Sequence, residues 1–355
     1  MCDMSPQSLS RRPLTASARD QRFFIPGPEL DHLRGGVKLG LNVHVGGGPG
    51  SGKTTLLRRI EHEFGNRAVF VRAEPSSTAS TLLAEVARAI RHPNDYFPST
   101  RPTDTELDVR YLEAVLSLAI DSWGDESERP AVVLVDGAIR EHLHVLFGRY
   151  RDALWELPLT WIVASRLATP PRPADAFFDR SIQLDPWPIS RLQRLIETRM
   201  PDWSAGWCAD VAATLGPASP TQALLDLQSL ALGGNQTALI AALADDRSQV
   251  AELPDRLRKF YAALCQAGPT HAGDEWLLET AGVTRSRVVH WLKELEALGL
   301  VEAERDGRRV NYTARRYSYL SKLLGNQAAS RAASDQDAVR SVVEASRAVA
   351  EAEPF

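Results

Sequence analysis

The chain has few cysteines, few lysines and no long hydrophobic run. Its three cysteines, Cys2, Cys208 and Cys265, are far apart and odd in number, which argues against a disulfide framework or a paired-cysteine zinc site. We expect Cys208 and Cys265 to be core residues. No apolar run approaches the ~18 residues of a membrane span, and the polar N-terminus lacks the apolar segment of a secretion signal. The expected location is the cytoplasm, with no membrane partner.

Lysine accounts for only five of the 41 basic residues, and the formal net charge is −4. This balance argues against a protein that coats nucleic acid along its whole length. The average conceals a local difference, because residues 253–324 carry twelve Lys or Arg against nine Asp or Glu. A basic module can therefore lie in the last third of the chain.

The order of sequence patterns predicts more than one domain. Continuous apolar runs such as "PAVVLVDG" and "LTWIVASR" are typical of central strands covered on both faces, and amphipathic helical patterns alternate with them. This alternation predicts a doubly wound parallel α/β sheet. We divide the chain into a disordered arm (1–22), the α/β core (23–186), a helical lid (187–252), a helix-rich C-terminal domain with a hairpin (253–324) and an Ala/Ser/Glu-rich tail (325–355).

The segment "GGPGSGKT", residues 47–54, fits the pattern G-x-x-x-x-G-K-[ST] without a mismatch. In such a strand-to-helix loop, backbone N–H groups turn toward phosphate oxygens and the helix N-terminus adds its dipole. Lys53 would reach the β- and γ-phosphates, and the Thr54 hydroxyl would ligate Mg²⁺. We expect ATP and Mg²⁺ as cofactors, bound by Gly47, Gly48, Pro49, Gly50, Ser51, Gly52, Lys53, Thr54 and Thr55.

An acidic residue is needed at the end of another core strand to hold the magnesium ion with Thr54. Asp136 ends the run "AVVLVD" and is the expected partner. Many ATPases place a glutamate directly after this aspartate to polarise the attacking water, and here the next residue is Gly137. Glu141 would have to reach back to serve instead, and a solvated helix charge is the simpler interpretation.

Three polar residues after the next strand are candidates for sensing the nucleotide. Ser165 ends "LTWIVAS" where a side chain could contact the γ-phosphate, and Arg166 follows it. Arg180, before "SIQLDPWP", could act as an arginine finger on a neighbouring subunit, which would require a homo-oligomer. A plain surface arginine is the alternative for Arg166 and Arg180.

The P-loop, the Asp136 strand, the Ser165 strand and "FFDRSIQLDPWPISRLQRLIETRM" together resemble AAA+ and STAND-type P-loop ATPases, with the greatest likeness to the origin-recognition initiator class. The likeness covers about the first 230 residues. It implies that "FIPGPELDHL", residues 24–33, covers the adenine. The resemblance implies nucleotide binding. Thr221 and Gln222 stand about where the family has its second sensor arginine, and this difference leaves rapid hydrolysis in doubt.

Residues 254–319 resemble the winged-helix domain of bacterial repressors and of initiator ATPases, through "TRSRVVHWLKELEALGLVEAERDGRRVNYTA". An apolar stripe of Val288, Leu292, Leu295 and Leu298 would dock the recognition helix, and Asp306 with Gly307 would form the hairpin turn. The N-terminal end of such a helix enters the DNA major groove. The candidate DNA contacts are Thr284, Arg285 and Arg287 on the helix, and Arg308 and Arg309 on the wing.

Three functional interpretations stay open at this point. The favoured one is an ATP-binding switch that contacts double-stranded DNA through its winged helix. The second is a signalling or scaffold protein whose winged helix contacts only protein. The third is a transcriptional regulator that uses the nucleotide as an effector and does not hydrolyse it.

Overall fold

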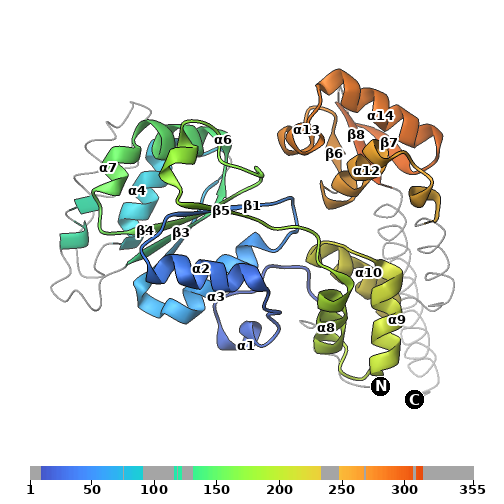
Figure 1. Cartoon of the computed structure of the whole chain (residues 1–355), viewed down its shortest axis with the longest axis horizontal. Coiled ribbons are helices and arrows are strands. Elements are labelled where there is room, and N and C mark those ends of the chain that lie inside the picture. Colours follow the sequence, from blue (N-terminus) through green and yellow to red (C-terminus); the bar gives the residue numbers. More distant parts are fainter. Residues whose placement is uncertain are drawn as a thin grey trace, which may run out of the picture.

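A five-stranded parallel sheet forms the core of the N-terminal half (Figure 1). The computed structural model describes residues 9–74, 76–90, 116–117, 119–121, 131–232, 248–267, 269–306 and 309–314. The strand order is β2-β3-β4-β1-β5, and every pairing is parallel. The predicted parallel α/β fold is confirmed. The strands are β1 (Val43–Gly46), β2 (Ala68–Arg72), β3 (Val132–Ala138), β4 (Thr160–Ser165) and β5 (Arg180–Gln183).

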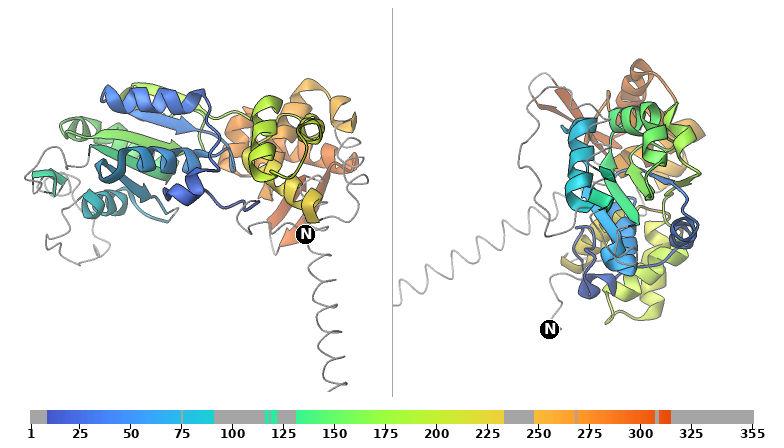
Figure 2. Two further views of the ribbon diagram at one scale, coloured as in Figure 1. Left: turned by 90° about the horizontal axis from the view of Figure 1, so that it is seen from below. Right: turned by 90° about the vertical axis from the view of Figure 1, so that its left-hand side faces the viewer.

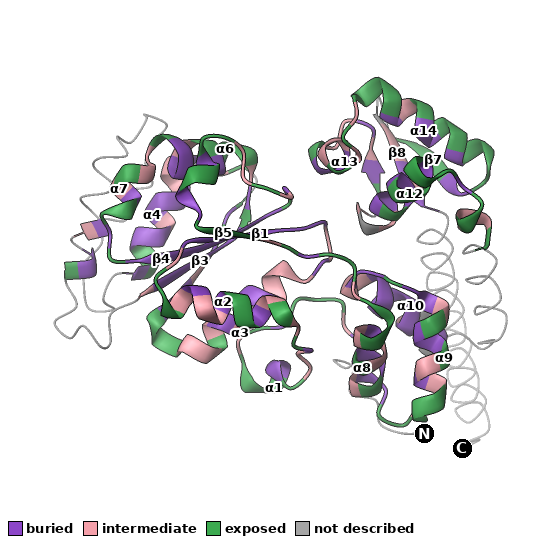
Figure 3. Ribbon diagram, viewed as in Figure 1, coloured by how far each residue is buried: buried purple, intermediate pink, exposed green. Residues whose placement is uncertain are grey.

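Helices cover both faces of the sheet, which explains why its central strands β3 and β4 are largely apolar and buried (Figure 3). In β3, Val132 and Leu134 pack with the helices of one face, whereas Val133 and Val135 pack with those of the other. The first face is covered by α2 (Pro28–Lys38) and α3 (Lys53–Phe64), and the second by α4 (Ala79–Ile90) and the segment after β3. That segment comprises α6 (Arg140–His142), η2 (Leu143–Arg149) and α7 (Arg151–Trp155). Two short connecting turns lie elsewhere in the core, η1 (Gly65–Arg67) and η3 (Ala174–Phe177).

Three helices after β5 share an apolar core of their own, in the segment expected to form the lid. The helices are α8 (Ile189–Arg199), α9 (Ala205–Leu215) and α10 (Pro220–Leu232). Cys208 is fully buried in their core. A backbone bridge between Trp187 and Ala218 joins the start of the lid to the segment before α10.

The C-terminal unit packs three helices against a three-stranded antiparallel sheet, and Figure 2 shows it from two further sides. The sheet order is β6-β8-β7. Cys265 is partly buried against the core of this unit. The elements are α12 (Asp255–Ala267), β6 (Thr270–His271), α13 (Glu275–Ala281), α14 (Arg285–Ala297), β7 (Val301–Asp306) and β8 (Arg309–Ala314).

Two details of the C-terminal unit differ from expectation. Leu298 is 52% exposed, and Trp291 is buried beside Val288 in its place, because the helix ends at Ala297 and leaves Leu298 outside the contact. Asp306 pairs with Arg309 as the last pair of the β7–β8 ladder, so it belongs to the strand and not to the turn.

Residues 9–22 differ from the expected disordered arm, because they pack on both the lid and the core. Leu9 is buried in the lid core, and its carbonyl oxygen accepts a hydrogen bond from Gln228 Nε2 at 2.7 Å. Leu14 is buried, and its N–H donates to Thr55 Oγ1 at 3.3 Å. The polar composition of this segment suggested disorder, yet its polar groups bond to one another and to the folded domain.

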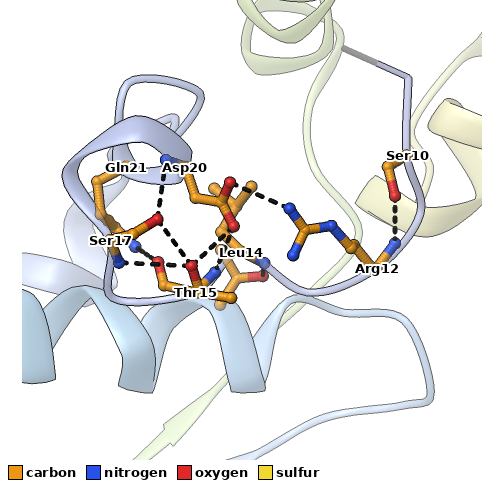
Figure 4. A network of polar contacts seen from close by, with 8 residues as sticks. Ser10, Arg12, Leu14, Thr15, Ser17, Asp20 and Gln21 are labelled. Carbon is orange, nitrogen blue, oxygen red and sulfur yellow. Dashed lines mark hydrogen bonds and ion pairs between the residues drawn. The ribbon is translucent and has the colours of Figure 1, made fainter. Parts of the chain in front are cut away.

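A compact polar turn holds this segment in shape (Figure 4). The Asp20 carboxylate accepts from the Thr15 N–H at 3.0 Å and from Arg12 Nη2 at 3.2 Å. The Thr15 N–H bond, opposed by burial, holds the pKa of Asp20 below its usual value. Ser17 caps the short helix α1 (Ala18–Gln21), and Gln21 Nε2 donates to the Thr15 carbonyl at 2.7 Å.

Several expectations fall outside the described residues. The expected tail 325–355 is not described at all, the expected lid is described only to residue 232 and from 248, and of residues 104–124 only 116–117 and 119–121 are described. Within the described ranges, no helix is long and apolar enough to cross a membrane.

Candidate functional site

The loop after β1 forms a tight turn against the lid. Gly50 has a φ of +72°, and an added Cβ there would lie 2.7 Å from the Cβ of Thr221. The Thr221 N–H donates to the Gly50 carbonyl at 3.4 Å. Glycine is therefore needed here both for the left-handed backbone and for the close approach of the lid.

Lys53 lies in the first turn of α3 and folds back over this loop. Its Nζ donates to the carbonyl of Gly47, to that of Gly48 at 2.8 Å and to Ser51 Oγ at 3.3 Å. Burial lowers the pKa of the Lys53 ammonium to about 8, and the nearby Asp136 charge opposes this shift. A partly buried ammonium that donates only to neutral oxygens is arranged to receive an anion.

Thr54 and Asp136 are brought together from positions 82 residues apart. Thr54 Oγ1 donates to Asp136 Oδ2 at 2.8 Å, and Asp136 is buried at the end of β3. Hard cations such as Mg²⁺ take oxygen ligands, which this hydroxyl and carboxylate supply. The loop, Lys53 and this oxygen pair together fit a magnesium–nucleoside triphosphate. Within the described residues, no cluster of three or more His, Cys, Asp or Glu forms another metal site.

The backbone at Gly137 explains why no glutamate follows Asp136. Gly137 has a φ of +84° at an irregularity in the β3–β4 register, and an added Cβ would lie 3.2 Å from the Ala73 carbonyl oxygen. A side chain at this position would be strained. Glu141 is exposed on α6, as expected of a solvated helix charge.

Ser165 is buried in the sheet and faces away from the phosphate loop. Strand alternation places Ser165 on the same face as Trp161 and Val163, opposite the face that α3 covers. Its Oγ lies 2.8 Å from His44 Nε2 and accepts from the Leu167 N–H at 3.1 Å. The expected sensor hydroxyl is therefore engaged by His44, a residue that sequence analysis did not single out.

His44 joins three strands through its two ring nitrogens. Nε2 contacts Ser165 on β4, and Nδ1 lies 3.0 Å from Ser181 Oγ on β5. Burial, with a smaller contribution from the Lys53 charge, lowers the pKa of His44 to about 4. The imidazole is thus held neutral inside the sheet.

The two candidate arginines lie at opposite ends of the sheet. Arg166 directly follows β4, at the end of the sheet where the phosphate loop lies, and its side chain is exposed. Burial is the main cause that lowers the pKa of Lys53, and the Arg166 charge lowers it further. Arg180 begins β5 and pairs with Val43 at the start of β1, whereas the loop follows the last residue of β1. Arg180 is thus remote from this chain's own loop, and its action on a neighbouring subunit stays a prediction.

A cavity of about 290 Å³ lies between the phosphate loop, the N-terminal segment and the lid. Phe24 and Ile25 line it, and the role of residues 24–33 in covering the base stays a prediction. Leu14 and Thr55 also line it, so the packed N-terminal segment contributes to its wall. The lid contributes chiefly apolar side chains and arginines: Trp187, Arg191, Leu195, Arg199 and Leu224.

The lid helix α10 presents Thr221, and not Gln222, to the loop. Gln222 is buried and donates through Nε2 to Asp226 Oδ1 at 2.8 Å within the same helix. Arg191 and Arg199 of α8 line the cavity and supply basic groups that the sequence analysis missed. Arg191 is held by Glu29 at 2.5 Å, and burial lowers the pKa of Arg199 to about 10.

The candidate DNA residues on α14 point in different directions. Thr284 precedes the helix and Arg285 lies beside Gly273 and His271, at the β6–α13 turn. Arg287 lies roughly 200° around the helix from Arg285, next to α12. Arg308 is outside the described residues, and only the backbone of Arg309 is described.

Comparison with known proteins supports the nucleotide-binding part of this assignment. Residues 41–157, which hold the phosphate loop and Asp136, match the family model described as AAA domain. No curated protein matches the chain. This segment carries the P-loop of an AAA-type α/β fold, in agreement with the sheet described above.

Among solved structures, the chain is similar to Cdc6p from Pyrobaculum aerophilum, at 15% identity over 91% of this chain and 97% of that one, with a TM-score of 0.44. It is also similar to the RuvB Holliday junction branch migration motor of Thermotoga maritima, at 16% identity over 89% of this chain and 99% of that one, with a TM-score of 0.42.

Proposed function

We propose that the protein is a nucleotide switch that binds Mg-ATP between its core and lid and contacts double-stranded DNA through its C-terminal unit. The observation that carries the nucleotide part is the Thr54–Asp136 pair beside a partly buried Lys53 whose hydrogen-bond partners are all neutral. Bound Mg²⁺ would neutralise phosphate charge. The loop backbone and Lys53 would bind the phosphates, and Thr54 and Asp136 would position the metal.

Slow turnover follows from the groups that surround this site. Gly137 replaces the usual base, Glu141 is exposed, and Ser165 is bonded to His44 on the other face of the sheet. Arg166 is the better candidate to meet a γ-phosphate, because its charge already acts on Lys53. These features favour a site that binds and senses the nucleotide over a motor.

The DNA part of the proposal depends on treating α12 to β8 as a winged helix. Three helices packed on a three-stranded sheet support this interpretation, with α13 and α14 as the helix-turn-helix pair. The exposed start of α14 would enter the major groove. Thr284 and Arg285 would lie at that end of the helix, and Arg308 and Arg309 would reach the flanking backbone from the wing.

Steady-state ATP hydrolysis and equilibrium ATP binding test the proposal, with and without duplex DNA. We expect tight Mg-dependent binding, slow hydrolysis that duplex DNA changes, and loss of hydrolysis in Asp136→Ala. Wild-type protein that binds no ATP would refute the nucleotide part. Duplex DNA that neither binds at low salt nor changes the ATP reaction would refute the DNA part.

One observation favours the scaffold alternative. Arg140, four residues after Asp136, forms an ion pair with Glu275 and lies 3.8 Å from Glu279, both on α13. The C-terminal unit thus rests on the nucleotide core through complementary charge. A protein-only role predicts ATP-dependent movement of this contact with no affinity for DNA.

A further inference from the structure

A basic pocket lies between α12 and α14, away from the nucleotide site. It has a volume of about 600 Å³, and Arg256, Lys259 and Arg287 contribute its charged groups. Arg256 and Lys259 are three residues apart on α12 and therefore share one face of that helix. Arg287 comes from α14, so three cations from two helices converge on one cavity. The sequence analysis named only Arg287.

The charges of this pocket are not balanced by carboxylates. Its lining contains no Asp or Glu, and within the described residues none of the three cations forms an ion pair. The neighbouring Arg258 differs, since it pairs with Asp255 on α12 and donates to the Ala251 carbonyl. Cations that repel one another without a counter-charge are arranged to meet an external anion.

Apolar side chains form the inner wall of the pocket, and its three cations lie around the opening. Phe260 and Trp291 belong to this wall, are only 2% and 7% exposed, and pack against each other in a tilted arrangement with ring centroids 5.2 Å apart. Arg287 lies over the Trp291 ring, its guanidinium carbon 5.6 Å from the centroid, which limits the directions that it can take. A ligand that entered from solvent would therefore meet the three exposed cations before the apolar inner wall.

The pocket adjoins the exposed face of α14. Val288, Leu292 and Leu295 face the core of the unit, whereas Ser286, His290 and Lys293 lie on the exposed side. Arg287 is at the border between these faces, on the side of α12. A polyanion that lay along the exposed face of α14 would therefore pass the pocket.

From this placement we infer that Arg256, Lys259 and Arg287 form a clamp for the sugar-phosphate backbone of the duplex whose groove α14 enters. The inference rests on the proposed DNA binding and adds a phosphate site on α12 that motif comparison does not assign. A phosphodiester supplies the compact negative charge that the three cations need, and the cavity is large enough for a sugar-phosphate segment with water. Such contacts set register and affinity without reading sequence.

The experiment compares the double variant Arg256→Ala/Lys259→Ala with Arg258→Ala, by fluorescence anisotropy on a mixed-sequence duplex from 50 to 300 mM salt. Arg258 is a matched control because it is on the same helix and already paired. We expect the double variant to bind about tenfold more weakly near 0.1 M salt and to lower the slope of log K against log salt by about two. Arg258→Ala should stay within about twofold of wild type.

Other outcomes separate this inference from the proposed function. A double variant with wild-type affinity and slope would overturn the clamp while leaving DNA binding intact. Wild-type protein that fails to bind the duplex even at 50 mM salt would overturn both. A glutamate-rich peptide that binds wild type but not the double variant, without duplex binding, would assign the pocket to a protein partner and overturn the clamp. ATP affinity and thermal unfolding of each variant establish that it is folded.

Discussion

The phosphate loop and the α12–α14 pocket are both built to meet anions, but they hold their cations in opposite ways. Lys53 is partly buried, and it is held by two backbone carbonyls and Ser51. Arg256, Lys259 and Arg287 are exposed side chains around an open cavity. The backbone preforms the phosphate loop, whereas the α12–α14 pocket consists of several cations around one cavity.

This difference determines what each site can recognise. A buried charge in a fixed cradle interacts strongly and is little screened by salt, so it can select one compact ligand. Each exposed cation attracts an anion only weakly, and the total attraction grows with the number of cations. This arrangement suits a long polyanion. We therefore expect single substitutions at the loop to have large effects and those in the C-terminal unit to have small ones.

The largest effect on ATP binding is expected for Lys53→Ala. Loss of the partly buried ammonium should weaken Mg-ATP binding by about 100-fold or more, which corresponds to about 2.7 kcal/mol. Isothermal titration at two salt concentrations measures this loss. Lys38→Ala, which removes an exposed lysine at the end of α2, is the control. An unchanged ATP affinity in Lys53→Ala would break the comparison.

The next effect concerns pH and the buried His44. Its pKa is about 4 in the folded protein and near 6.5 when unfolded, so the unfolded chain binds more protons between these values. Stability is therefore complete above about pH 6.5 and falls as the pH drops toward 4, by up to about 3 kcal/mol. Urea unfolding of wild type and His44→Gln across this range measures the difference.

His44→Gln should lose less stability than wild type as the pH falls from about 6.5 toward 4. His32→Gln, at an exposed position on α2, should retain the wild-type profile. Identical pH profiles for wild type and His44→Gln would show that the imidazole is not buried between β4 and β5, and would weaken the contrast between a closed core and an open C-terminal unit.

A smaller effect is expected where the N-terminal segment closes the cavity. Leu14→Ala removes a buried side chain beside Thr55 and should cost about 2 kcal/mol of stability, with a several-fold loss of ATP affinity. Thermal unfolding and ATP titration measure both. Leu39→Ala, at a side chain that is 70% exposed, should change neither. Equal behaviour of the two variants would mean that the segment is not part of the preformed site.

The smallest effect is expected at the contact between core and C-terminal unit. Arg140 and Glu275 are 47% and 60% exposed, so their pair should contribute less than about 1 kcal/mol. Arg140→Glu should loosen the contact, and Glu275→Arg in the same chain should restore it. Cross-linking between α6 and α13 in the single and double variants measures this coupling. A double variant that behaves like Arg140→Glu would exclude direct pairing.

Much of the core could be predicted because its signals are local. Residues 47–54 carry the loop pattern on consecutive positions, and "AVVLVD" marks Asp136 as the end of a buried strand. The parallel sheet then brings Thr54 and Asp136 to the same edge. Strand β6 could not be predicted, because its two residues become a strand only by pairing with Tyr312 and Asn311.

The roles of other residues could not be predicted from the sequence because they depend on contacts with residues far away in the chain. The polar residues 9–22 suggested disorder, whereas their order comes from Asp20, Thr55 and the lid. Ser165 stands at a sensor-like position, but the parity of β4 turns it toward His44.

The sequence by itself determined the phosphate loop, its oxygen ligands and the strand-helix alternation, because each depends on neighbouring residues and on backbone preferences. Only the tertiary structure decided which face of the sheet received Ser165, and that Arg256, Lys259 and Arg287 share one pocket. Those relations join residues far apart in the chain, where helix packing and strand register, and not local preference, place one side chain beside another.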